Sequence, residues 1–281
     1  MSEIVFIADF YANEINGGGE LSNHELIGIL TALKFPVTVL KSSQCTVDFL
    51  EERKDSYFII ANFIALSGEC KQYLQDKCKY VIYEHDHKYL TTRDPSVFKD
   101  YKAPAENIIN RDFYQKAKGV FCQSALHKEV VTKNLNLNNI HSVGGNLWSL
   151  EILNEIEVYT DKEKREKYSI WNSNNPIKCT ALARAYCFKN SLEEDLIGPL
   201  PYREFLSRLT DNKYFVFFPQ TLETLGRVVV EARMSGMTVL SNKKVGALSE
   251  SWFKLKGKDL IQVMREKRKT IPEKVLEVLM S

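Results

Sequence analysis

The chain has 281 residues, of which 44% are hydrophobic and 26% are charged, with a formal net charge of +2. It contains no internal repeat, no low-complexity tract and no apolar run of membrane length, which excludes repeat proteins and integral membrane proteins. Six scattered cysteines without paired metal spacing indicate reduced thiols. We therefore expect a soluble cytoplasmic protein, in the host cytoplasm if the source is viral, with one large or two modest α/β domains.

The first predicted unit is an apolar strand at residues 4–10, a glycine-rich turn and a helix over about 21–33. The turn reads Asn16-Gly17-Gly18-Gly19-Glu20. A strand, a glycine turn and a helix in this order make a phosphate-binding geometry, but glycine clusters also occur in ordinary turns. The run lacks the spaced glycines of the dinucleotide fingerprint, so both interpretations stay open at this point.

A second apolar strand, within residues 79–90, ends in Glu84-His85-Asp86-His87. Histidine and carboxylate side chains are good metal ligands, but the sequence shows no further pair of ligands to complete such a site. We therefore predict no metal. His85 is a candidate for a polar role near a ligand, because a neutral imidazole can both donate and accept hydrogen bonds.

The next segments are predicted to be structural. Residues 119–131 read as a strand, a serine cap at Ser124 and a helix, and residues 140–148 read as a strand with a Gly-Gly-Asn turn. Residues 151–176 carry a charge run and an Asn/Ser-rich stretch, which predict a connecting segment between two domains. The charge run is interpreted as a solvated helix, with nucleic-acid contact as the alternative.

Residues 179–190 are predicted to be an apolar strand that delivers Arg184 and Lys189. Two cations just past a strand end suit a diphosphate, because fixed positive charge stabilises a leaving phosphate without reorganisation. Taken alone, they also fit surface charges in a polar loop. Residues 195–209 then read as a turn with Gly198 and Leu200, followed by a helix.

The most informative stretch, residues 214–240, reads as strand, loop, helix, glycine and strand. The backbone N–H groups of Thr224, Leu225 and Gly226 are predicted at a helix N-terminus, which attracts phosphate. Gly226 lets a ligand approach the backbone, and Glu231 offers a carboxylate that can accept both hydroxyls of a ribose. Glutamates are also common as solvated helix charges, so this alternative stays open.

This stretch resembles the motif of the retaining, GT-B-fold glycosyltransferases of family 4, in which a glutamate, seven residues and a second glutamate precede a small residue and glycine. Glu223, Glu231 and Ser235-Gly236 match it. The resemblance implies an α/β chain with GT-B architecture, in which two Rossmann-like domains face each other across a nucleotide-sugar cleft. It also implies that Glu223 lies near the transferred sugar and that Glu231 holds the ribose.

The same resemblance assigns roles to the earlier segments. Gly18 and Gly19 look like the loop that touches the diphosphate and sugar, and His85 looks like the histidine that approaches the donor sugar. Arg184 and Lys189 would stabilise the leaving diphosphate, and Gly198 to Leu200 would lie near the base. The implied domains are residues 1–150, a connection at 151–176, a nucleotide-sugar domain at 177–270, and a C-terminal helix at 271–281 that in such enzymes commonly crosses back to the first domain.

The chain departs from the family in length, because typical members are longer by many tens of residues. The acceptor is therefore not implied by the resemblance. A compact, lysine-rich and asparagine-rich chain fits a phage genome, and Lys254, Lys256 and Lys258 suggest contact with nucleic acid. The acceptor hydroxyl is accordingly expected on a glycan or on hydroxymethylated DNA.

The sequence thus predicts a glycosyltransferase, hexosyl or pentosyl, that uses a nucleoside diphosphate sugar as donor with retention of configuration and needs no metal or other cofactor. Two alternatives stay open. One is a nucleotide-binding adaptor that has lost catalysis. The other is an NAD(P)-dependent Rossmann oxidoreductase, although Val37–Leu40 is not followed by the acidic ribose ligand of that class.

Overall fold

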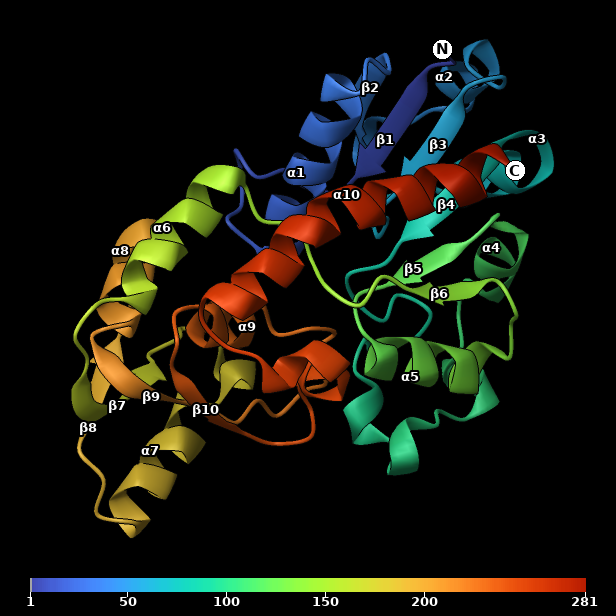
Figure 1. The fold of residues 1–281 in the computed structure, drawn as a ribbon. Coiled ribbons are helices and arrows are strands. Elements are labelled where there is room, and N and C mark those ends of the chain that lie inside the picture. The colour runs from blue at the N-terminus through green and yellow to red at the C-terminus, as the bar shows by residue number, and fades with distance from the viewer. Residues whose placement is uncertain (1) are drawn as a thin grey trace. The chain divides into compact units, whose positions relative to one another are not determined.

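The computed structural model describes residues 2–281 and divides them into two compact α/β units (Figure 1). The first unit holds residues 2–147 and 267–281, and the second holds residues 148–266. Each unit is built on one parallel sheet. This arrangement follows from the alternation of short apolar strands with helices, because parallel strands need a crossover between them.

The first unit contains a six-stranded sheet in the order β2-β1-β3-β4-β5-β6, and every neighbouring pair is parallel. The five residues of β1 are all buried, as expected for a strand with both faces covered. The strands are β1 Ile4–Ala8, β2 Val37–Lys41, β3 Tyr57–Ile60, β4 Lys79–Tyr83, β5 Val120–Cys122 and β6 Ile140–Ser142. The helices are α1 Gly18–Ala32, α2 Val47–Glu52, α3 Gly68–Lys77, α4 Arg111–Lys116 and α5 Ala125–Leu135.

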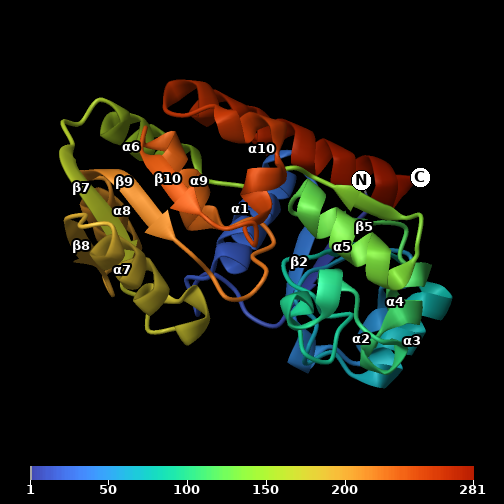
Figure 2. The same ribbon diagram turned by 90° about the horizontal axis from the view of Figure 1, so that it is seen from below.

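The second unit contains a four-stranded parallel sheet in the order β10-β9-β7-β8. Its strands are β7 Arg165–Trp171, β8 Glu194–Ile197, β9 Asn212–Phe217 and β10 Thr238–Ser241. Its helices are α6 Leu150–Thr160, α7 Thr180–Lys189, α8 Tyr202–Leu209 and α9 Arg227–Met234. Figure 2 shows α7 on one side of the sheet and α6 and α9 on the other. Alternate side chains of β9 explain this, because Val216 packs with α7 whereas Phe215 and Phe217 pack with the opposite helices.

Helix α10, Lys258–Met280, is longer than the helix expected near the C-terminus and continues through Pro272. Its residues up to 266 belong to the second unit, and those from 267 belong to the first. Ile271, Val275 and Leu279 are buried in a core cluster with β1 and β3 of the first unit. Their spacing of four residues places them on one face of the helix.

Three sequence expectations about the middle of the chain are wrong. Residues 151–176 are not a connecting segment, because they form α6 and β7 of the second unit. The charge run there is the end of α6, a turn and the exposed start of β7, rather than a solvated helix. Residues 179–190 form α7 and not a strand, since the buried residues Ala183 and Cys187 are four apart, the spacing of a helix.

Other expected elements are confirmed. The first strand lies at β1, the strand before the histidine segment is β4, and Ser124 caps α5 by accepting a hydrogen bond from the His127 N–H at 3.1 Å. Within residues 2–281 no helix is both long enough and apolar enough to cross a bilayer. All six cysteines are unpaired thiols.

Candidate active site

In the second unit, the loop after β9 carries Glu223 and is fixed to the segment after β10. The Glu223 N–H donates to the Lys244 carbonyl at 2.8 Å, and the Gly246 N–H donates to the Glu223 carbonyl at 2.9 Å. Gly226 follows with a φ of +81°, and a Cβ there would lie 2.8 Å from Val245 Cγ1. Only glycine satisfies both conditions without strain. Helix α9 therefore starts at Arg227, at the carboxyl edge of the sheet, where ligands bind in open α/β folds.

Glu231 forms the centre of a buried polar cluster on α9. Its side chain is 3% exposed, and its Oε1 atom accepts hydrogen bonds from three side chains. The donors are Trp148 Nε1 at 2.8 Å, Tyr202 Oη at 2.6 Å and Arg227 Nε at 3.0 Å. The Arg227 guanidinium also stacks 4.4 Å from the centre of the Trp148 ring. A buried carboxylate needs such donors, since an unpaired buried charge is strongly unfavourable.

Burial raises the pKa of Tyr202, and the Glu231 carboxylate raises it further. The phenol therefore keeps its proton at neutral pH and acts as a donor to Glu231. Tyr202 is the first residue of α8, directly after the loop with Gly198 and Leu200. Gly198 has a φ of +100°, and its carbonyl accepts a hydrogen bond from the Asn172 side chain at 3.3 Å. The loop expected to lie under a base is thus linked through Tyr202 to the expected ribose carboxylate.

Glu223 forms an ion pair with Lys178, with 2.6 Å between Glu223 Oε1 and Lys178 Nζ. Both side chains are largely buried, and the Lys178 ammonium also lies 5.7 Å from the centre of the Trp171 ring. Lys178 belongs to the short helical turn Pro176–Lys178 that follows β7. A cation therefore follows the carboxyl end of a strand, as expected for a diphosphate site. The strand is β7, and not the strand that the sequence predicted at residues 179–190.

This places the expected cations differently from the sequence interpretation. Arg184 lies on α7, is exposed, and pairs with Glu194 at 2.9 Å. Lys189 is exposed in the last turn of the same helix. At 1.5 Å per residue, Lys189 lies about 13 Å along α7 from its first residue. Lys178 and Arg227 are the cations that contact Glu223 and Glu231, and sequence reasoning missed both.

Of the remaining second-unit candidates, Thr224 is half-buried and Leu225 is buried. Leu225 is 2% exposed and packs in the hydrophobic core, and its carbonyl accepts the Ala247 N–H at 2.9 Å. Leu200, by contrast, is 39% exposed. An exposed apolar side chain beside Gly198 is available for contact with a flat ligand, whereas Leu225 anchors the loop.

In the first unit, two predicted site residues come together. A Cβ added to Gly19 would lie 3.1 Å from His85 Cγ, so the imidazole packs directly on the backbone of α1. His85 Nε2 lies 2.6 Å from Asn23 Oδ1, and this contact assigns the proton to Nε2. Burial and the Lys88 charge lower the pKa of His85 to about 3, so the ring is neutral at physiological pH. Gly18 is the first residue of α1, after the N-cap Gly17.

Next to the half-buried His85, the buried side chains of Glu84, His87, Lys88, Tyr114 and His127 form a second, enclosed polar cluster. Glu84 and Lys88 are fully buried and form an ion pair, and the Tyr114 hydroxyl donates to the same carboxylate. His127 donates from Nε2 to the Asp86 carbonyl at 3.0 Å and accepts the Gln123 N–H at Nδ1. Burial lowers the pKa of His87 to about 4. Within residues 2–281 no group of three or more His, Cys, Asp or Glu side chains could hold a metal ion.

Comparisons with known proteins identify the fold. No protein-family model and no curated protein matches the chain. Among solved structures, it is similar to HepE of Anabaena in complex with UDP and glucose, at 13% identity and a TM-score of 0.56 over 99% of this chain and 93% of that one. It is similar to an alpha-glucosyltransferase in complex with UDP and a 13-mer DNA containing an HMU base, at 10% identity and a TM-score of 0.50 over 99% and 94%.

A third similar structure is UGT2 of Phytolacca americana with UDP-2fluoro-glucose and pterostilbene, at 10% identity and a TM-score of 0.50 over 99% and 94% of the two chains. At these identities the likeness concerns fold, and it extends over nearly the whole length of every chain. The expected fold is thereby confirmed: this chain has the two-sheet α/β GT-B fold of glycosyltransferases.

Proposed function

We propose that the protein is a glycosyltransferase that moves a sugar from a nucleoside diphosphate sugar to a hydroxyl group, with retention of configuration and without a metal. The main support for this proposal is the Glu231 cluster. Its buried carboxylate accepts three side-chain hydrogen bonds and lies on the helix that starts at the carboxyl ends of the strands of the second sheet. The fold adds support, since the similar structures contain UDP or a UDP sugar.

Glu231 is proposed to bind the ribose. A carboxylate has about four acceptor positions on two oxygens, and a ribose diol offers two donors. The three protein donors all reach Oε1, so they fix the orientation of the group. Ribose would then bind through Oε2 or take the place of a protein donor such as Tyr202.

Lys178 and Arg227 are proposed to stabilise the leaving diphosphate, together with the N-terminus of α9. Developing negative charge on the leaving group is the main electrostatic demand of this reaction, and fixed cations and helix N-termini meet it. These two cations replace Arg184 and Lys189 in this role, since both contact the motif glutamates. Diphosphate binding would require each cation to share its charge between its carboxylate and the ligand.

Within the second unit, Glu223 is proposed to contact the transferred sugar. Within the first unit, His85, Gly18 and Gly19 are proposed as sugar-binding groups. The neutral imidazole of His85 can exchange hydrogen bonds with sugar hydroxyls without adding a charge. Glu223 is assigned to positioning, because a reaction on the same face as the leaving group needs no covalent protein nucleophile.

The acceptor is proposed to be a hydroxyl on hydroxymethylated DNA, with a glycan as the alternative. One structure of similar fold is a glucosyltransferase in complex with DNA that contains an HMU base. Lys254, Lys256 and Lys258 are exposed in this chain, although Lys258 pairs with Asp161 at 2.7 Å. Neutralising all three should weaken DNA binding and lower its salt dependence, and unchanged binding would contradict the DNA proposal.

The deciding experiment is thermal stabilisation by nucleoside diphosphates, nucleotide sugars, NAD and NADP. A ligand that binds only the native state raises the melting temperature, so a hit identifies the donor. The wild type should respond to one diphosphate family, Glu231→Ala should not, and the matched control Glu163→Ala, at an exposed position, should respond like the wild type. A response to dinucleotides alone would favour an oxidoreductase. Binding without slow donor hydrolysis would favour a non-catalytic adaptor.

A further inference from the structure

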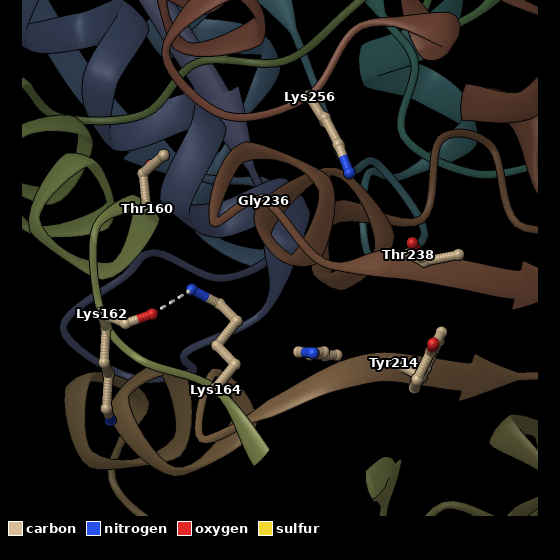
Figure 3. Close-up of a pocket in the computed structure, with 8 residues that line it drawn as sticks. Thr160, Lys162, Lys164, Tyr214, Gly236, Thr238 and Lys256 are labelled. Atoms are coloured by element: carbon tan, nitrogen blue, oxygen red, sulfur yellow. Dashed lines mark hydrogen bonds between the residues drawn. The ribbon is translucent and has the colours of Figure 1, made fainter. Parts of the chain in front are cut away.

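The second unit has a lysine-lined pocket at the edge of its sheet opposite the Glu223 loop (Figure 3). Lys213 and Tyr214 lie at the start of β9 and Thr238 begins β10, whereas Glu223 follows the carboxyl end of β9. Strands in a parallel sheet all run in one direction, so the pocket lies at the amino ends of the strands and Glu223 lies at their carboxyl ends. The lining residues are Thr160, Lys162, Lys164, Lys213, Tyr214, Gly236, Thr238 and Lys256.

The pocket carries more positive than negative charge. Lys162 pairs with Asp211, and Lys213 pairs with Glu166. The other two lysines, Lys164 and Lys256, form no ion pair with a carboxylate among residues 2–281. Among the described residues, the pocket therefore keeps two ammonium groups without an ion-pair partner, although the Asp161 carboxylate, which pairs with Lys258, also acts on Lys164 from a longer distance.

Of these two lysines, Lys164 has the more unusual surroundings, because it is half-buried and hydrogen-bonded to backbone carbonyls. Its ammonium donates to two backbone carbonyls, those of Tyr159 at 2.5 Å and Lys162 at 3.2 Å, and Figure 3 marks the second contact. Burial and the neighbouring Lys162 lower the pKa of Lys164. A nearby anion would stabilise the charged form of a half-buried lysine whose hydrogen bonds go to carbonyls, because attraction between charges is stronger away from bulk water. In Figure 3 the Lys256 amine points into the same space.

The shape of the pocket suits a small ligand. Its volume is about 310 Å³, the lower end of the range of about 300–1,000 Å³ for small-molecule sites. Gly236 forms part of the wall with bare backbone, and even an added Cβ would come no closer than 3.9 Å to the nearest group, the Thr160 carbonyl oxygen. Thr238 adds an exposed hydroxyl.

We propose that this pocket binds a phosphate dianion, either free inorganic phosphate or the terminal phosphate of a phosphomonoester. A phosphate monoester carries a charge of about −1.5 to −2 at pH 7 and three acceptor oxygens. That charge matches the two ammonium groups of Lys164 and Lys256, neither of which forms an ion pair in the part of the chain that the structure describes. A phosphodiester carries a single charge per group and matches them less well. The site is separate from the proposed donor site.

The test is lysine acetylation of the full-length wild-type protein, followed by mass spectrometry, with sodium phosphate compared with sodium chloride at equal ionic strength. Phosphate should slow acetylation of Lys164 and Lys256 severalfold and saturably. Lys254 and Lys258, which do not line the pocket, are internal controls and should react at an unchanged rate. Equal slowing at all four lysines, or no slowing at Lys164 and Lys256, would overturn the proposal.

Two variants separate this pocket from other phosphate sites. Lys178→Met removes a proposed donor-site cation and should leave phosphate protection of Lys164 intact. Lys256→Met should weaken that protection, whereas Lys254→Met should not. Protection by a single-stranded oligonucleotide without a terminal phosphate, in the absence of protection by inorganic phosphate, would contradict the assignment of a dianion. Loss of protection in Lys178→Met would also contradict a separate pocket.

Discussion

Among residues 2–281, each unit has a buried ion pair between residues four apart in sequence, and the two pairs differ in their surroundings. Glu84 and Lys88 lie beyond the end of β4, and neither side chain is exposed at all. Arg227 and Glu231 lie on α9, with side-chain exposures of 11% and 3%. The first pair is enclosed by protein groups, whereas the second sits at the start of a helix where a ligand can reach the cation.

The difference shows that the degree of burial decides whether a charged pair can stabilise the fold only or can also bind a ligand. An enclosed pair can hold its segment in one conformation, but it cannot exchange partners with a ligand. A pair at a helix N-terminus can do so, because its cation keeps contact with solvent. We therefore expect changes in the first pair to affect folding and changes around the second pair to affect donor binding and turnover.

The largest expected effect is on stability, from Lys88→Met. Removing one partner of a fully buried ion pair leaves an uncompensated charge and typically costs about 3–5 kcal/mol. The free energy of unfolding, measured with urea, should fall by about that amount. The double variant Glu84→Gln/Lys88→Met should recover part of the loss, since no carboxylate is then left unpaired. A single variant as stable as the wild type would show that the pair does not hold this segment.

Lys178→Met should mainly reduce turnover. Loss of one electrostatic contact to a developing negative charge typically costs about 10²–10³ in kcat. Donor hydrolysis without acceptor should fall by that factor under conditions in which the variant is folded. Urea unfolding measures separately the stability lost because Glu223 has no ion-pair partner. Arg184→Met is the matched control, because Arg184 pairs with Glu194 on the surface of α7. If Arg184→Met reduced turnover as strongly as Lys178→Met, the original assignment of the diphosphate cations would be restored.

The enclosed cluster should also make stability depend on pH. His87 and His85 have pKa values lowered to about 4 and about 3, below the ordinary value of 6.5. Between pH 6.5 and about 4 the unfolded chain therefore binds more protons than the folded protein, and stability falls as the pH falls. Each fully affected histidine contributes about 1.4 kcal/mol per pH unit. Urea unfolding at pH 7, 6 and 5 measures the slope.

His87→Gln should reduce that slope, and the control His24→Gln, at an exposed position on α1, should leave it unchanged. A pH-independent free energy of unfolding between pH 7 and 5 would mean that the buried histidines accept protons in the folded protein. The enclosed cluster would then be open to solvent, and the contrast with the Arg227–Glu231 pair would disappear.

The smallest expected effect is that of Trp148→Phe. This change removes one hydrogen bond to Glu231 and keeps an aromatic ring under Arg227. The free energy of binding the nucleoside diphosphate should therefore weaken by about 1 kcal/mol, the typical contribution of one hydrogen bond. Affinity for the donor should fall modestly, because Tyr202 and Arg227 still hold the carboxylate. Calorimetric titration with the nucleoside diphosphate checks the affinity. Complete loss of binding would make Trp148 a direct contact rather than a positioning residue.

The sequence predicted the GT-B fold because its motifs occur at the ends of apolar strands, where the chain must form turns. Glu223, Glu231 and Gly226 follow β9 in this way, and His85 follows β4. Their neighbours in space were harder to foresee. Tyr202 and Trp148 reach Glu231 from segments 29 and 83 residues away, and no local pattern encodes such contacts.

The cations were misplaced for a more local reason. Residues 179–190 are rich in small and apolar side chains, and a short apolar run does not by itself separate strand from helix. The spacing of Ala183 and Cys187 was the signal for a helix. Had β7 been placed at Arg165–Trp171, Lys178 would have been the first cation after the strand.

All three tryptophans of the chain, at positions 148, 171 and 252, lie in the second unit. Trp148 lies beneath Arg227, and Trp171 lies near Lys178. The tryptophan emission of the protein therefore comes from the second unit, and two of the three tryptophans adjoin the proposed diphosphate cations. Binding of the nucleotide sugar should therefore change the tryptophan fluorescence. The first step of the proposed reaction can then be followed without an added label.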